Sequence, residues 1–108
     1  LLKAQYFFVK QFKITNVFAN IHHNHQTISK YCNDQQLNEK IQLVYEPELL
    51  DIGGAIHHLA GMKDIAYRGN LFLVNCDQFL FFDFKLLMDS LRLLEHFPVV
   101  LFAIKVSK

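Results

Sequence analysis

An aspartate follows the most hydrophobic strand-like segment of the sequence. Residues 71–74 read Leu-Phe-Leu-Val, and Asn75, Cys76 and Asp77 come directly after them. In an open parallel sheet, ligands bind outside the carboxyl ends of the strands, which is where Asp77 would lie. A hard cation such as Mg²⁺ at this edge would bridge the Asp77 carboxylate to phosphate oxygens. The alternative is that Asp77 and the next acid, Asp83, are a loop residue and a helix cap.

Paired glycines mark a second candidate site, because they precede a short apolar segment with helical character. Gly53 and Gly54 follow the sequence Glu-Pro-Glu-Leu-Leu-Asp-Ile, which begins at Glu46. Glycines at the start of a helix let a ligand approach the backbone, and the free N–H groups there can bind it. The alternative is a tight turn without a ligand.

Histidines offer a third kind of chemistry, since imidazole is a zinc ligand. His22, His23 and His25 cluster, and His57 and His58 are adjacent. Adjacent residues of a strand point to opposite faces, however, and no cysteine lies at ligand spacing. We therefore interpret these histidines as capping, hydrogen-bonding or surface residues.

The sequence argues against a cysteine nucleophile and against a base-stacking surface. Cys76 stands beside the candidate acid, but no histidine lies near it in the sequence, so we expect a buried thiol that fills a small space. The run Phe-Leu-Phe-Phe at residues 79–82 has no interleaved basic residue, which single-strand binding requires. We expect it to pack in the core or at an interface.

Composition describes one domain with a modest core, since 52% of the 108 residues are hydrophobic. The 11 basic and 10 acidic side chains form neither a basic stripe nor an acidic tail, which argues against a nucleic acid partner. Two cysteines without Cys-x-x-Cys spacing, and no secretory leader, favour the cytoplasm. The apolar runs are shorter than the ~20 residues of a membrane-spanning helix, so we expect no membrane partner.

Strand-like and helix-like segments alternate along the chain. We expect strands at residues 17–21, 41–45, 71–74 and 99–104, and helices at residues 1–12, 24–31, 55–60 and 83–94. Asn24 and Asp83 are the expected N-caps of two helices, and Gly61 is the expected left-handed end of a third. This alternation predicts an α/β fold, a Rossmann-like three-layer sandwich with a mainly parallel sheet.

Three motifs in this order resemble the sugar-phosphate nucleotidyltransferases. They are Asn-Ile-His-His at residues 20–23, Glu-Pro-Glu-Leu-Leu-Asp-Ile-Gly-Gly at 46–54 and Leu-Val-Asn-Cys-Asp at 73–77. The family has Asn-x-His at a strand end, then a Glu-Pro-x-x-Leu-x-Thr-(Ala/Gly)-Gly loop, then Val-Asn-Gly-Asp at another strand end. The similarity covers nearly the whole chain, and it is greatest to the mannose-1-phosphate guanylyltransferase-like and N-acetylmuramate-1-phosphate uridylyltransferase-like members.

The resemblance implies roles for particular residues. Asp77 would help to hold Mg²⁺ against the nucleotide phosphates, with Asn75 beside it, and the loop from Glu46 would lie against the base, with backbone groups near Gly53 and Gly54 in contact. Two positions depart from the pattern, because the family commonly has threonine where this sequence has Ile52 and glycine where it has Cys76.

The family's Gly-x-Gly-x-Arg phosphate loop and Lys-Pro element do not occur in this sequence, which begins without methionine. We therefore expect residues 1–108 to be the central part of a single nucleotidyltransferase domain, and to be inactive without the rest. The expected enzyme serves nucleotide-sugar biosynthesis. It joins a sugar 1-phosphate to a nucleoside triphosphate, uses Mg²⁺ as its cofactor and releases pyrophosphate.

Two other functions stay open, and so does the formation of a homo-oligomer by this protein. The first is an inactive relative that keeps a nucleotide or sugar-nucleotide site for regulation, which the residues at positions 52 and 76 would suit. The second is an assembly role through exposed apolar surface such as residues 79–82.

Overall fold

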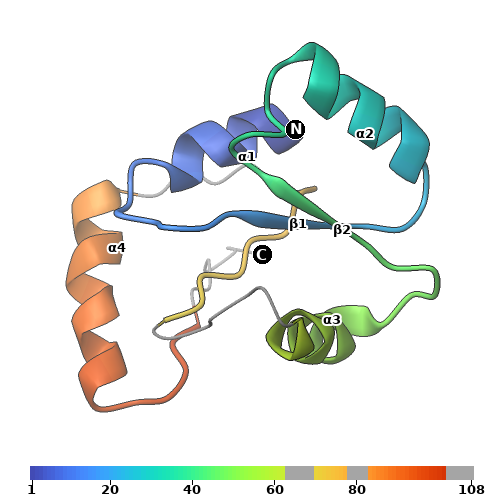
Figure 1. Ribbon diagram of the computed structural model, residues 1–108. Helices are drawn as coiled ribbons and strands as arrows, with labels where there is room; N and C mark the ends of the chain where they lie inside the picture. The colour runs from blue at the N-terminus through green and yellow to red at the C-terminus, as the bar shows by residue number, and fades with distance from the viewer. Residues whose placement is uncertain (63–69, 78–82, 102–108) are drawn as a thin grey trace, which may run out of the picture.

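The computed structural model describes residues 1–62, 70–77 and 83–101 and shows a mixed α/β arrangement (Figure 1). Its elements are α1 (Leu2–Val9), β1 (Phe18–Ile21), α2 (His25–Asp34), β2 (Gln42–Tyr45), α3 (Asp51–Gly61) and α4 (Phe84–Leu91), which continues as one 3₁₀ turn (Arg92–Glu95). No helix in these three ranges is long and apolar enough to cross a lipid bilayer.

A β-α-β unit forms the centre of the described structure. Strands β1 and β2 pair in parallel, with Phe18 opposite Gln42 and Ile21 opposite Tyr45, and α2 connects them. Both strands confirm the segments that the apolar runs predicted. Because parallel strands run in the same direction, their carboxyl ends lie at one edge of the sheet.

Helices α1 and α2 cover one face of this sheet (Figure 1). Cys32, Leu37 and Ile41 are almost fully buried at its centre. The side chains packed against them come from both helices and both strands: Leu2, Tyr6, Val17, Ala19, Ile28 and Leu43. Since side chains alternate along a strand, the register pair of Ala19 and Leu43 defines the helix-covered face. The neighbouring pair, Asn20 and Val44, therefore belongs to the opposite face.

Phe12 joins the end of α1 to segments that are distant in the sequence. Helix α1 ends at Val9, earlier than predicted, and tight turns follow in which the N–H of Phe12 donates to the carbonyl of Val9 at 3.0 Å. The Phe12 ring then lies 5.2 Å from the ring of Phe72 and 5.0 Å from that of Phe84, between centroids. Such aromatic pairs contribute roughly 0.5–1.5 kcal/mol each beyond the area they bury.

The predicted strand at residues 71–74 is wrong, because these residues have an irregular conformation without strand pairing. Leu71 and Leu73 are also largely exposed. An apolar run becomes a strand only where a neighbouring strand offers its N–H and C=O groups, and the only sheet of the described residues consists of β1 and β2. Residues 99–101 are irregular too, and residues 102–104 of the last predicted strand lie outside the described ranges.

The helix ends test three cap predictions. Asp83 caps α4 as expected, since its carboxylate accepts hydrogen bonds from the N–H groups of Lys85 at 2.9 Å and Leu86 at 3.4 Å. Asn24 occupies the N-cap position of α2 in a left-handed conformation, φ 54°, but its side chain makes no cap bond. The prediction for Gly61 is wrong, because this glycine is the last residue of α3 and Met62 follows in an extended conformation.

The Asp83 cap gives a direct test of the α4 boundary. Replacing Asp83 with alanine leaves two N–H groups of the first turn without their acceptor, so we expect the free energy of unfolding to fall by about 1 kcal/mol. Asp83→Asn is the matched control, since asparagine caps helices equally well. Urea unfolding of both variants measures the difference, and equal stability of the two would contradict the cap.

Candidate functional site

The carboxyl ends of β1 and β2 bring together two motifs that lie apart in the sequence. The Nδ2 group of Asn20 donates a hydrogen bond to Oε1 of Glu46 at 2.8 Å. The Nδ1 atom of His22 lies 2.7 Å from the carbonyl oxygen of Glu46. The backbone N–H of Glu46 donates to the carbonyl of Ile21 at 2.9 Å. Three different atoms of Glu46 therefore bind three successive residues of β1 and its end.

Burial gives these bonds their importance. The Glu46 side chain is only 4% exposed, and a buried carboxylate is costly unless hydrogen bonds compensate it. The amide of Asn20 supplies such a bond. Because a carbonyl oxygen can only accept, the proton of the neutral His22 ring is on Nδ1, which donates to Glu46.

The other clustered histidines have structural roles or are exposed. The ring of His25, at the first position of α2, lies 4.4 Å from the ring of Tyr45 between centroids, so the two side chains pack together. His23 is exposed. Throughout the described part of the chain, no group of three or more histidine, cysteine and acidic side chains is arranged to hold a metal ion.

The two glycines lie in the first turn of α3, which begins at Asp51, two residues before Gly53. No side chain caps this helix, and the N–H groups at the start of a helix have no partner within it. The glycines differ in their surroundings. A Cβ atom on Gly53 would meet nothing within 4 Å, whereas one on Gly54 would lie 2.9 Å from Cβ of Leu50. Packing therefore requires Gly54, while Gly53 leaves the turn open to a ligand.

Asn75 and Asp77 are both exposed, and Asp77 lies in a turn that follows the irregular residues 70–74. Neither residue has a hydrogen bond or ion pair with another described side chain. The structure thus joins Asn20, His22 and Glu46 but shows no contact between them and Asp77. Ile52, at the position where the resembling family has threonine, is 58% exposed.

Cys76 is exposed, so the prediction that it is a buried thiol is wrong. The thiol that fills the core is that of Cys32, which is fully buried. Partial desolvation of the sulfur raises the pKa of Cys76, the positive charge of the N-terminal amino group lowers it, and the negative charge of Asp77 raises it, so that the net shift is upward. A raised pKa keeps the thiol protonated and therefore weakly nucleophilic.

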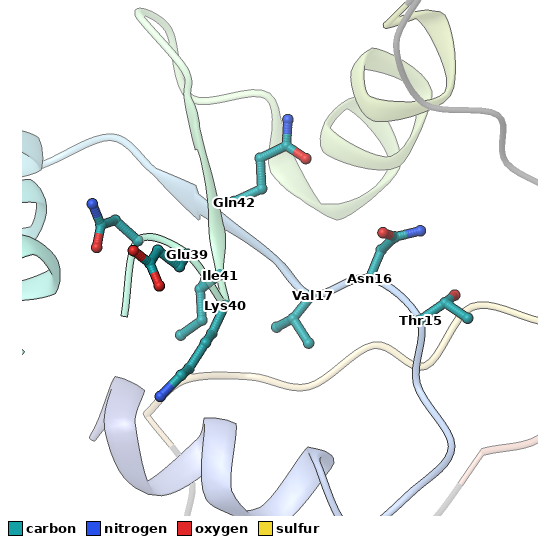
Figure 2. A pocket seen from close by; sticks show the side chains of 8 residues that line it. Thr15, Asn16, Val17, Glu39, Lys40, Ile41 and Gln42 are labelled. Atoms are coloured by element: carbon teal, nitrogen blue, oxygen red, sulfur yellow. The ribbon is translucent and has the colours of Figure 1, made fainter. Parts of the chain in front are cut away.

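A cavity of about 300 Å³ lies at the other end of the sheet, next to the amino ends of β1 and β2. Residues 15–17 and 38–42 line it. Figure 2 shows that the side chains of Glu39 and Lys40 point in different directions and that those of Asn16 and Gln42 do not converge with them. This cavity lacks the converging polar groups of a ligand site.

Asn20 and His22 were not among the predicted site residues, although Asn-x-His at a strand end was one of the motifs. Their spacing of two residues places both side chains on the same face of an extended strand. That spacing was the available signal, but their shared partner, Glu46, follows a different strand and only the fold reveals it. The run at residues 79–82 lies outside the described residues.

Comparison with known proteins adds no relative: no protein-family model matches the chain, and no curated protein or solved structure is significantly similar to it.

The hydrogen bond between Asn20 and the Glu46 carboxylate predicts that two substitutions of Glu46 differ in their effect on stability. Glu46→Ala removes the acceptor of the Asn20 amide, which is exposed and can then bond to water, so we expect the free energy of unfolding to fall by about 0.5–1.5 kcal/mol, the net contribution of one hydrogen bond. Glu46→Gln keeps a carbonyl oxygen that accepts the same bond and should lose less. Chemical denaturation of both proteins provides the comparison, and the bond would be unimportant if the alanine variant were as stable as the glutamine variant.

The glycines of α3 predict effects of opposite sign. Gly53→Ala should raise the free energy of unfolding by about 0.5–1 kcal/mol, because alanine favours the helix and nothing obstructs its methyl group. Gly54→Ala should lower it by about 1–3 kcal/mol, because the methyl group would collide with Leu50. Thermal and urea unfolding test the pair, and stabilisation by both substitutions would refute the assigned contact.

Proposed function

We propose that this chain is part of a sugar-1-phosphate nucleotidyltransferase, which joins a sugar 1-phosphate to a nucleoside triphosphate and releases pyrophosphate. One observation supports this proposal most. Asn20, His22 and Glu46 belong to two of the motifs that resemble this family, and both Asn20 and His22 are hydrogen-bonded to Glu46 at the carboxyl edge of a parallel strand pair. Ligands of α/β proteins bind at such edges.

The finer fold is part of the same proposal. We propose that β1, α2 and β2 belong to a larger, mainly parallel sheet with helices on both faces, a Rossmann-like three-layer sandwich. A β-α-β unit is the building block of such sheets, because parallel strands need a crossover connection. In a chain that also contains a phosphate-binding loop, this domain would work in cytoplasmic nucleotide-sugar biosynthesis.

Asp77 is the residue that would hold Mg²⁺, and Asn75 beside it would contact the nucleotide. The Asp77 carboxylate suits a hard cation, both side chains are exposed, and Mg²⁺ in nucleotide sites commonly uses only one or two carboxylates together with substrate phosphates. When bound, the ion would neutralise charge on the phosphates. The segment from Glu46 to Gly54 would lie against the base, where the free N–H groups of the first α3 turn can donate to it.

The proposed reaction is a single in-line substitution at phosphorus. An oxygen of the sugar 1-phosphate forms a bond to the α-phosphorus, and the bond from that phosphorus to the oxygen bridging to the β-phosphate breaks. Pyrophosphate carries away the electron pair of the broken bond. Catalysis of this kind depends on positioning and on electrostatic stabilisation of the phosphate oxygens. In this chain, residues at the carboxyl edge would orient the nucleotide and exclude water from it.

A relative that binds nucleotide or sugar nucleotide without catalysis is the second candidate. The observation in its favour is the exposed hydrocarbon side chain of Ile52 in the first turn of α3, where the resembling family offers a hydroxyl group. An assembly role is the third candidate, and it draws on the exposed apolar side chains Leu71 and Leu73.

Nucleotide binding by the full-length protein tests the proposal. We expect one of GTP, UTP, CTP and dTTP to bind in calorimetry with a requirement for Mg²⁺, and Asp77→Ala to weaken that binding at least tenfold. Asp34→Ala, which removes an exposed acid at the end of α2, is the matched control and should bind normally.

The outcomes separate the candidates. Release of pyrophosphate when a sugar 1-phosphate is added supports the transferase, and binding without release supports the inactive relative. Absence of binding to all four nucleotides refutes the transferase and leaves either an inactive relative that binds only a sugar nucleotide or the assembly role.

A further inference from the structure

Glu46 does more than connect two strands, because it orients two side chains whose opposite ends are free. Asn20 uses Nδ2 to reach the carboxylate, so its Oδ1 atom is available. His22 uses Nδ1 to reach the carbonyl, so its Nε2 atom is available. No described residue bonds to either atom, and both side chains are exposed. Two acceptors are therefore fixed in orientation and open to solvent.

The tautomer and the amide orientation are set by chemistry. A carboxylate and a carbonyl can only accept hydrogen bonds, so Asn20 must present NH₂ to Glu46 and the neutral His22 ring must carry its proton on Nδ1. The remaining atoms, Oδ1 and Nε2, are then both acceptors. This assignment leaves no donor at the exposed ends of the two side chains when His22 is neutral.

The bonds to Glu46 also affect these acceptors. Donating a hydrogen bond to a charged carboxylate polarises the amide of Asn20 and increases the electron density on Oδ1. Donation from Nδ1 fixes the tautomer and the orientation of the His22 ring, as it does in metal sites where a second partner orients a histidine ligand. One buried residue thereby polarises one exposed acceptor and orients the other.

The position of the pair favours a ligand over a structural role. Asn20 and His22 are two residues apart at the end of β1, a spacing of about 6.6 Å along an extended chain that keeps both on the same face. That face is the one opposite to the pair of Ala19 and Leu43, which α1 and α2 cover. The acceptors are thus at the carboxyl edge and on the face without those two helices.

We propose that Asn20 Oδ1 and His22 Nε2 form a binding site for a ligand group with two hydrogen-bond donors. The identity of the ligand at this site rests on the proposed function. Two parts of the substrates offer such donors: an amino and imino edge of a nucleobase, as in guanine, and neighbouring hydroxyl groups of a sugar. Uracil and thymine present a single ring N–H between two carbonyl groups and match the pair poorly.

A pair of histidine substitutions separates binding from folding. His22→Asn places an amide NH₂ near the position of Nδ1, so it keeps the bond to Glu46 and removes the atom that binds the ligand. His22→Gln places an amide oxygen near the position of Nε2, so it keeps an acceptor there and loses the bond to Glu46. The full-length proteins are titrated with GTP, UTP, CTP, dTTP and mannose 1-phosphate, and their urea unfolding is compared.

We expect His22→Asn to unfold like the wild type and to bind one donor-bearing probe about tenfold more weakly. His22→Gln should be less stable and should retain more of that affinity. An effect on GTP alone identifies the base as the source of the donors, and an effect on mannose 1-phosphate alone identifies the sugar.

Unchanged affinity of His22→Asn for a probe that the wild type binds overturns the site while the proposed function stands. Mannose 1-phosphate binding that depends on His22, without binding of any nucleotide, supports the site and refutes the transferase. Failure of the wild type to bind any of the probes overturns both.

Discussion

The hydrogen bonds of Glu46 join the two described strands at their carboxyl ends. Parallel pairs are slightly less stable per residue than antiparallel pairs, and here each strand has only four residues. Glu46 extends the pairing beyond Tyr45. Its buried carboxylate accepts a hydrogen bond from the opposite strand, and its backbone takes part in two more bonds. Glu46 thereby orients the side chains of Asn20 and His22 at this edge.

The hydrogen bonds of Glu46 also determine which side-chain atoms a ligand would meet at the carboxyl edge of the strand pair. Polar side chains at a strand end ordinarily sample several rotamers, and ordering such a side chain on binding costs on the order of 0.5–1.5 kcal/mol. Asn20 and His22 incur that cost on folding, because Glu46 already fixes them. In contrast, Asn75 and Asp77 have no such partner among the described residues, so their order would have to come from bound Mg²⁺ and phosphate. One half of the proposed site is preorganised and the other half depends on its ligands.

The parts of the fold that the sequence predicts well are those with local causes. The apolar runs that became β1 and β2, the helix between them and the Asp83 cap all follow from neighbouring residues. The strand prediction for residues 71–74 is wrong because strand pairing depends on two segments. An apolar run identifies only one of them. The contact of Gly54 with Leu50 and the burial of Cys32 in place of Cys76 depend on packing in the same way. Of the three hydrogen-bonded residues at the carboxyl edge, only Glu46 was a predicted site residue. Asn20 and His22 stood in a motif, and their bonds to Glu46 required the parallel register.

The ring contacts of Phe12 imply an order of events during synthesis of the chain. All partners in the β1-α2-β2 unit have been synthesised once Glu46 has left the ribosome, so this unit can close early. Phe12 precedes that unit, yet two of its ring partners, Phe72 and Phe84, emerge much later. During that interval a large aromatic side chain at the end of α1 stays without them, and nascent chains with such exposed surface are the ones that chaperones bind and that aggregate. The segment around Phe12 therefore exposes an aromatic side chain in the growing chain that two other rings contact in the folded protein.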